Sequence, residues 1–337
     1  MELYDLWFVL IGVLWIGFFF LEGFDYGVGI LLPFLGKGDK ERRAIINTIG
    51  PVWDGNEVWM ITAGGAIFAA FPHWYATLFS GFYLALVVIL VSLILRGVAF
   101  EFRSKDDNPR WRSFWDWAIF GGSAIPALLW GVAFGNLVQG TPIDASMNFT
   151  GNFFDLLSPY TLICGLAGLM VFLLHGAIFL SLKTDGVIRT RAEGIAQQLV
   201  VLVIAAAAVL AAANYVYLDL FSKIGINPGL MPVASAAALL AVGYFVREKQ
   251  YGWAFVLMGA TILLSVATFF WFLYPNVMVS STNDAYSLTV ETARASDKTL
   301  ELMTVVALVF VPIVLLYQGW TYWAFRKRIT AESTLEY

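Results

Sequence analysis

The sequence is poor in the residues from which soluble proteins and most metal sites are built. Only 13% of its 337 residues are charged, whereas a soluble domain carries roughly a quarter, so a soluble globular protein is excluded. The single cysteine, Cys164, excludes an internal disulfide and a cysteine metal site. Two histidines, His73 and His175, are too few for dense histidine ligation. No P-loop or glycine-rich nucleotide fingerprint occurs, and we expect neither a bound metal nor a nucleic-acid partner.

Hydrophobic residues dominate instead, at 60% of the chain, and the mean hydropathy is +0.76. These values indicate an integral membrane protein, in which each crossing helix needs roughly 20 apolar residues. Acids precede the first apolar run, which is too long for a signal peptide, so we expect a first span that is retained. The sequence predicts an all-α fold with one polytopic membrane domain, 1–337, and nine transmembrane helices, at about 6–35, 44–71, 76–102, 114–137, 159–182, 195–218, 230–246, 251–274 and 303–325.

Basic residues are distributed unequally between the two sides of this predicted topology. The loops after odd-numbered spans, together with the C-terminal segment, hold 16 Lys and Arg residues. The opposite side holds only Lys223, Arg294 and Lys298. Because cytoplasmic loops are enriched in Lys and Arg, the N-terminus is predicted outside and the C-terminus in the cytoplasm.

Acidic residues inside two predicted spans are the main candidates for function. Asp25 lies in the first span, and Asp54 and Glu57 lie in the second. Asp25 and Asp54 are each about ten residues, or ~15 Å, from the inner end of their span, so we expect them at the same interior level. Ionisable groups at membrane depth are usually retained for function. A carboxyl in apolar surroundings tends to keep its proton, which favours a proton relay; helix-locking hydrogen bonds and ion or substrate binding are the alternatives.

Other polar residues within the predicted spans have simpler interpretations. Arg96 is near the inner end of span three, where snorkelling to the surface is slightly favoured over pairing with an acid of the first two spans. Glu101 lies at the inner interface, as a solvated acid or a proton mouth. His175 is expected to serve in helix packing and His73 to lie at the outer rim. The glycines at 27 and 29 indicate close helix packing.

Several longer motifs resemble one known family, subunit II of the cytochrome bd-type quinol oxidases. The resemblance extends over nearly the full length of the chain. It is carried by Gly-Phe-Asp-Tyr-Gly-Val-Gly (23–29), Trp-Asp-Gly-Asn-Glu-Val-Trp (53–59), Ile-Thr-Ala-Gly-Gly-Ala-Ile-Phe-Ala-Ala (61–70), Gly-Val-Ala-Phe-Gly-Asn-Leu (131–137) and Val-Pro-Ile-Val-Leu-Leu-Tyr (311–317).

The resemblance implies a heterodimer in the bacterial cytoplasmic membrane, surrounded by lipid, with a larger subunit I as the partner. That partner is expected to ligate haem b and haem d, while this chain ligates none. The complex would oxidise quinol, reduce O2 to water and take protons from the cytoplasm. The family fold would be two four-helix bundles plus one peripheral helix. The proton-path acids proposed for the family map onto Asp25 and Asp54; Glu57, Arg96 and Glu101 are our additions to that path.

Two other functions remain open at this point. A proton-coupled transporter would also use acids at mid-membrane depth, usually beside matching broken helices, which the sequence does not clearly contain. A purely structural membrane subunit would use the same acids to hold helices together. Haem absorbance in a complex with a second polytopic chain would separate the oxidase from the transporter, and turnover of Asp25→Asn and Asp54→Asn variants would separate a relay from helix locking.

Overall fold

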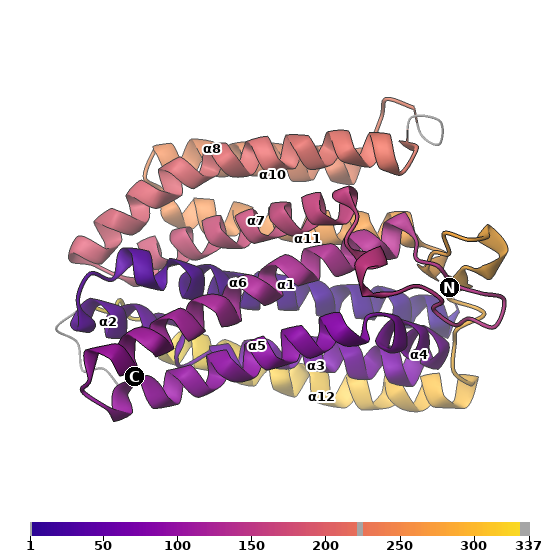
Figure 1. Ribbon diagram of the computed structural model, residues 1–337, viewed down its shortest axis with the longest axis horizontal. Helices are drawn as coiled ribbons and strands as arrows, with labels where there is room; N and C mark the ends of the chain where they lie inside the picture. The colour runs from indigo at the N-terminus through magenta and orange to yellow at the C-terminus, as the bar shows by residue number, and fades with distance from the viewer. Residues whose placement is uncertain (1, 221–224, 331–337) are drawn as a thin grey trace.

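The computed structural model describes residues 2–220 and 225–330, so the predicted outer-side Lys223 lies outside the described residues. The chain is almost entirely helical, with long helices running along the long axis of the molecule (Figure 1). The α-helices are α1 (Leu3–Leu35), α2 (Asp39–Ile49), α3 (Trp53–Ala70), α4 (Pro72–Gly81), α5 (Tyr83–Phe102), α6 (Pro109–Gln139), α7 (Pro159–Lys183), α8 (Gly186–Tyr217), α10 (Leu230–Arg247), α11 (Tyr251–Leu273) and α12 (Asp297–Ala324).

Several helices begin where the sequence carries capping signals. The side chain of Asn108 accepts a hydrogen bond from the backbone N–H of Arg110, two residues into α6. Ser158 caps α7 in the same way, and Pro159 follows at the first helical position. A side-chain acceptor satisfies one of the N–H groups that a helix start leaves without a partner, and proline there loses nothing. Local sequence therefore sets these boundaries.

Eight helices in the described residues are long and apolar enough to cross a membrane, which makes the chain a multi-pass membrane protein. The segment predicted as the second span, 44–71, is not among them. It is divided into α2 and α3 around Pro51, and α3, although as long as α10, carries the polar residues Asp54, Asn56 and Glu57 in its first turns. Proline lacks the N–H that a continuous helix needs and clashes with the preceding turn. The predicted third span, 76–102, is likewise divided, because its first residues belong to α4 and α5 begins only at Tyr83.

Helix α1 lies at the centre and packs against α3, α6, α7 and α11. The pair α8 and α10 forms one long edge of the molecule, and α12 runs along the opposite edge (Figure 1). Of the described residues in α12, only Leu300 is buried. Apart from the helices, the 3-10 helices η1 (Arg103–Lys105), η2 (Phe153–Leu156) and η3 (Asp284–Tyr286) and a two-stranded antiparallel sheet of β1 (Asn276–Met278) and β2 (Leu288–Thr289) lie in the connections.

Two glycines allow α1 to approach its neighbours closely, as the sequence predicted. A Cβ on Gly27 would lie 2.0 Å from the carbonyl oxygen of Phe172 and 2.8 Å from the Cα of Gly176, both in α7. A Cβ on Gly29 would lie 2.1 Å from the Oγ of Ser123 in α6. Small residues let helix backbones approach within a membrane, and here they fix the part of α1 that carries the acidic residues.

Candidate functional site

A buried group of charged side chains joins α1, α3 and α5. The guanidinium of Arg96 in α5 forms ion pairs with Glu22 of α1 and with Glu57 of α3. Arg96 and Glu22 are fully buried, and the side chain of Glu57 is 15% exposed. The guanidinium carbon also lies 4.8 Å from the ring centroid of Tyr26. The snorkelling interpretation of Arg96 is therefore wrong, because two carboxylates lie within reach of the buried guanidinium.

A second polar group lies beside the first and centres on Asn56 of α3. Its side-chain N–H donates to Asp25 in α1 at 2.7 Å, and its side-chain oxygen accepts from the hydroxyl of Tyr322 in α12 at 2.8 Å. The amide of Gln318 donates to the same oxygen at 3.4 Å, and the Gln318 oxygen accepts from the indole N–H of Trp59 at 2.9 Å. Asn56 and Asp25 are both fully buried. This amide thus connects the deep aspartate to α12.

Three of the five predicted site residues are brought together, and two are not. Asp25, Glu57 and Arg96 lie in or beside the two buried groups. Asp54 is exposed on α3, so the expectation that it shares the interior with Asp25 is wrong. A helix turns by 100° per residue, and Asn56, two positions later, is the residue that faces α1. Glu101 is exposed near the end of α5, as expected for an interfacial acid.

Glu22 is the acidic site residue that the sequence reasoning missed, and Asn56 and Tyr322 are uncharged ones. Glu22 lies three positions before Asp25, so both carboxyls project from nearby faces of α1. That spacing was a usable signal, since an acid inside a 33-residue apolar helix needs a partner. Within the described residues, one oxygen of Glu22, one oxygen of Asp25 and two guanidinium nitrogens of Arg96 have no hydrogen-bond partner.

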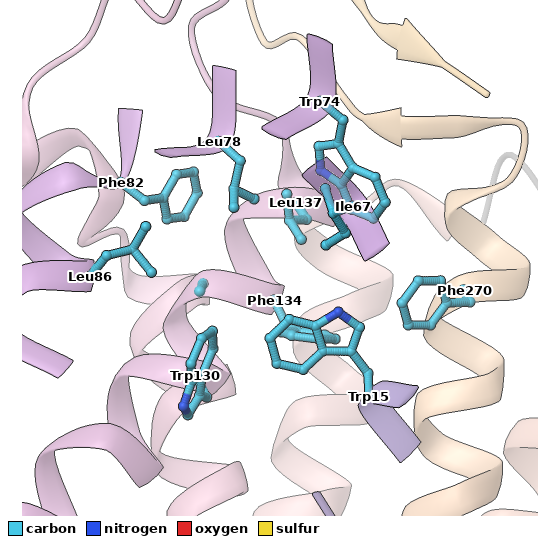
Figure 2. A pocket seen from close by; sticks show the side chains of 11 residues that line it. Trp15, Ile67, Trp74, Leu78, Phe82, Leu86, Trp130, Phe134, Leu137 and Phe270 are labelled. Atoms are coloured by element: carbon cyan, nitrogen blue, oxygen red, sulfur yellow. The ribbon is translucent and has the colours of Figure 1, made fainter. Parts of the chain in front are cut away.

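Aromatic side chains separate the charged residues from the end of the molecule at which α1 begins. The ring of Phe18 lies 6.3 Å from that of Tyr26 and 5.8 Å from that of Trp130, and Trp15 lies 5.0 Å from Trp130. Beyond them is a small apolar cavity of about 30 Å³, ringed by aromatic side chains from α1, α4, α6 and α11 (Figure 2). Apolar cavities tend to stay dry, so this layer is a poor place for a water chain.

The two histidines lie in different surroundings. His73 is exposed. His175 is fully buried, its Nε2 lies 2.9 Å from the carbonyl oxygen of Phe20, and its ring stacks on Phe255 at 4.9 Å. Across residues 2–220 and 225–330, no three His, Cys, Asp or Glu side chains lie close enough to hold one metal ion. The position of His175 agrees with the predicted packing role.

The arrangement can bind and release protons within the membrane-spanning helices. Fully ionised, three carboxyls and one guanidinium would give a buried net charge of −2, which is strongly unfavourable in apolar surroundings. Protons held on the carboxyls would neutralise this charge. Carboxyl and amide side chains lie one after another in space, from the exposed face of α3 inward to α1. This geometry suits stepwise proton transfer as well as helix cross-linking.

Comparison with known proteins gives a consistent result over the whole chain. The profile of the family described as cytochrome bd terminal oxidase subunit II matches residues 3–325. Cytochrome bd ubiquinol oxidase subunit 2 of Bacillus subtilis (strain 168) is 44% identical over 336 residues, which cover 100% of this chain and 99% of that protein. Cytochrome bd-I ubiquinol oxidase subunit 2 of Escherichia coli (strain K12) is 42% identical over 361 residues, with 97% and 95% coverage.

A solved structure supports the fold independently. A chain of the bd oxidase from Geobacillus thermodenitrificans superimposes with a TM-score of 0.78 at 16% sequence identity. The match covers 97% of the present chain and 100% of that chain. At this identity the similarity concerns the fold alone.

Proposed function

The chain belongs to the family of subunit II of the cytochrome bd terminal oxidases, and we propose that it supports a haem-bearing subunit I and supplies a proton path from the cytoplasm to it. The complex would oxidise quinol and reduce O2 to water, a reaction that consumes protons. The proposal rests on the buried Glu22–Arg96–Glu57 group with Asp25 beside it. Helix α3, which contributes Glu57, is also exposed along one face, and this face gives access to the group.

The exposed faces of α3 and α12 suit a large helical partner. Gly55, Gly64 and Gly65 of α3 have open space where a Cβ would stand, which would let another helix approach closely. In α12, Leu308 is 72% exposed and Leu316 is 76% exposed. We propose that subunit I covers this face. Asp54, exposed in the isolated chain, would then lie between the two subunits.

The proton path that we propose begins at the inner end of α3. Asp54 lies one turn before Glu57, and Glu57 contacts Arg96, which contacts Glu22. Asp25 joins through Asn56, whose amide holds one carboxylate oxygen and leaves the other without a partner in the described chain. Glu101, at the exposed end of α5, would act as a collecting acid at the surface. These residues would hold and pass protons; none of them would contact O2.

The sidedness of the path rests on the predicted topology. We propose nine membrane crossings, with the broken segment of α2 and α3 as the second, in two four-helix bundles plus one peripheral helix. The N-terminus would lie outside and the C-terminus in the cytoplasm, in a bacterial cytoplasmic membrane. The aromatic layer of Phe18, Tyr26 and Trp130 would then close the outer side of the acid group, which favours proton uptake from the cytoplasm.

We propose that subunit I ligates haem b and haem d, which would carry electrons from quinol to O2. In this chain, Nε2 of His175 is already engaged by a backbone carbonyl and His73 is exposed, so no step of the proposed path passes through a haem on this chain. The contribution of this subunit would be protons, packing and exclusion of water.

A purely structural role is the second candidate, because the same groups cross-link α1, α3, α5 and α12. Turnover of the purified complex distinguishes the two roles. Asp25→Asn keeps an oxygen that can accept from Asn56, so haem content should stay intact while turnover falls by at least roughly tenfold, since positioned proton transfer contributes 10²–10⁴-fold. Thr190→Ala, on the surface of α8, serves as a control that should leave turnover unchanged.

Turnover equal to wild type in Asp25→Asn would favour the structural role. If Asp25→Asn assembles poorly, Asp25→Glu keeps an ionisable group and should restore turnover along with assembly. The proton-coupled transporter loses support from the family membership, and proton uptake by the subunit alone in liposomes would be needed to revive it.

A further inference from the structure

A larger cavity lies at the other end of the molecule from the aromatic layer, between α1, α7, α11 and α12. Its volume is about 360 Å³, at the low end of the roughly 300–1,000 Å³ of small-molecule sites. Its walls are mainly apolar and aromatic, from Phe20, Phe24, Phe179 and Phe255. Apolar cavities tend to stay dry, so this space suits a hydrocarbon chain better than a column of water.

Basic residues border this cavity where α7 and α12 end. Lys183 is the last residue of α7, and Arg326 follows the end of α12 by two positions. The ammonium of Lys183 donates to the carbonyl of Phe325, and Arg326 donates to the carbonyl of Trp323 at 2.6 Å. Arg328, next to them, donates to the carbonyl of Leu182 at 3.2 Å. Backbone carbonyls at two helix ends thus hold three cations close together.

Some basic residues of the described chain pair with carboxylates, but these three cations do not. Throughout residues 2–220 and 225–330, no carboxylate forms an ion pair with Lys183, Arg326 or Arg328. By contrast, Arg42 forms an ion pair with Asp116, and Arg191 forms one with Glu41. The mouth of the cavity is therefore positively charged, while its walls are apolar.

We propose that this cavity binds one anionic phospholipid, with its phosphate between Lys183 and Arg326 and part of one acyl chain along the aromatic walls. Positive charge at helix ends attracts anionic headgroups. The bound acyl chain would fill the apolar space between the helices. Free phosphate would make no use of the apolar walls. An uncharged isoprenoid would make no use of the cations.

Lipid binding to the whole, purified complex tests the proposal. After delipidation, the complex is titrated with phosphatidylglycerol or phosphatidylethanolamine, and bound lipid is counted by native mass spectrometry. Each basic residue near a membrane surface strengthens anionic-lipid binding roughly fivefold. The Lys183→Gln, Arg326→Gln double variant should therefore bind phosphatidylglycerol roughly 25-fold more weakly. The matched control, Arg247→Gln with Lys249→Gln, removes two exposed cations elsewhere and should bind like wild type.

Further arms separate the apolar and the charged parts of the site. Leu182→Trp fills the cavity and keeps both cations, so it should also weaken phosphatidylglycerol binding. Inorganic phosphate, added in excess, should fail to displace the lipid. Wild-type affinity in the double variant, or complete displacement by phosphate, would overturn the proposal. Equal affinity of the wild-type complex for the two lipids would overturn it as well, whether or not the variants assemble.

Discussion

Replacing Arg96 by methionine would remove the cation that holds the buried acids together. Methionine has similar length and fills the space, so the change is mainly one of charge. It leaves Glu22, which is fully buried, and Glu57, which is 15% exposed, without their common partner. The loss is therefore one of electrostatic balance inside the protein and not of surface contact.

The expected size follows from burial. Removing one partner of a buried ion pair destabilises a protein by roughly 3–5 kcal/mol, because an uncompensated buried charge remains. Most of this should come from Glu22, since water can reach Glu57 in part. Adding Glu22→Gln to Arg96→Met removes the buried orphan charge and should restore more than half of the loss. The pair of Arg189 with Glu193 in the first turns of α8 is partly exposed, at 32% and 17%, and pairs near the surface are worth only about 0–1 kcal/mol, so Arg189→Met is the control.

Equilibrium unfolding in mixed micelles with increasing sodium dodecyl sulfate, followed by tryptophan fluorescence, gives the comparison. The expected order of stability is wild type and Arg189→Met, then the Arg96→Met, Glu22→Gln double variant, then Arg96→Met alone. An Arg96→Met protein within about 1 kcal/mol of wild type would refute the reasoning. So would a double variant less stable than the single one, because then the orphaned carboxylate would not be the cause.

Gly27→Ala should destabilise the protein by roughly 1–3 kcal/mol through overpacking against the backbone of α7, and so lower the yield of assembled complex. Gly121→Ala is the control, because a Cβ there meets open space and should leave the yield unchanged. Equal yields of the two variants would contradict this. The Lys37 backbone N–H and the Arg191 guanidinium hold the pKa of Glu41 below its usual 4.5. The ionised carboxylate therefore stabilises the fold above that pH and less as pH falls through the lowered pKa, so thermal midpoints of Glu41→Gln and wild type should differ near neutral pH and converge in acid; a pH-independent difference would contradict it.

The covalent sequence determined the class of protein and the family without help from the fold. Apolar run lengths and low charge are properties of composition, so they predicted an all-helical membrane protein, and the motif at 23–29 and the one at 53–59 identified the family that the comparisons confirmed. The close approach at Gly27 was also predictable, because small residues within an apolar helix have few other uses.

The partners of the acids were decided only in three dimensions. Position along a helix gives depth, and depth alone suggested that Asp25 and Asp54 would meet. Which side chain faces a neighbouring helix depends on rotation, and the rotation of α3 placed Asn56 against Asp25. Likewise, Arg96 lay near a predicted surface in sequence, yet the packing of α5 against α1 and α3 put it between two carboxylates. Composition and run length thus determined that this chain crosses a membrane, whereas the relative rotation of its helices, set by packing between distant segments, decided which of its acids are buried together.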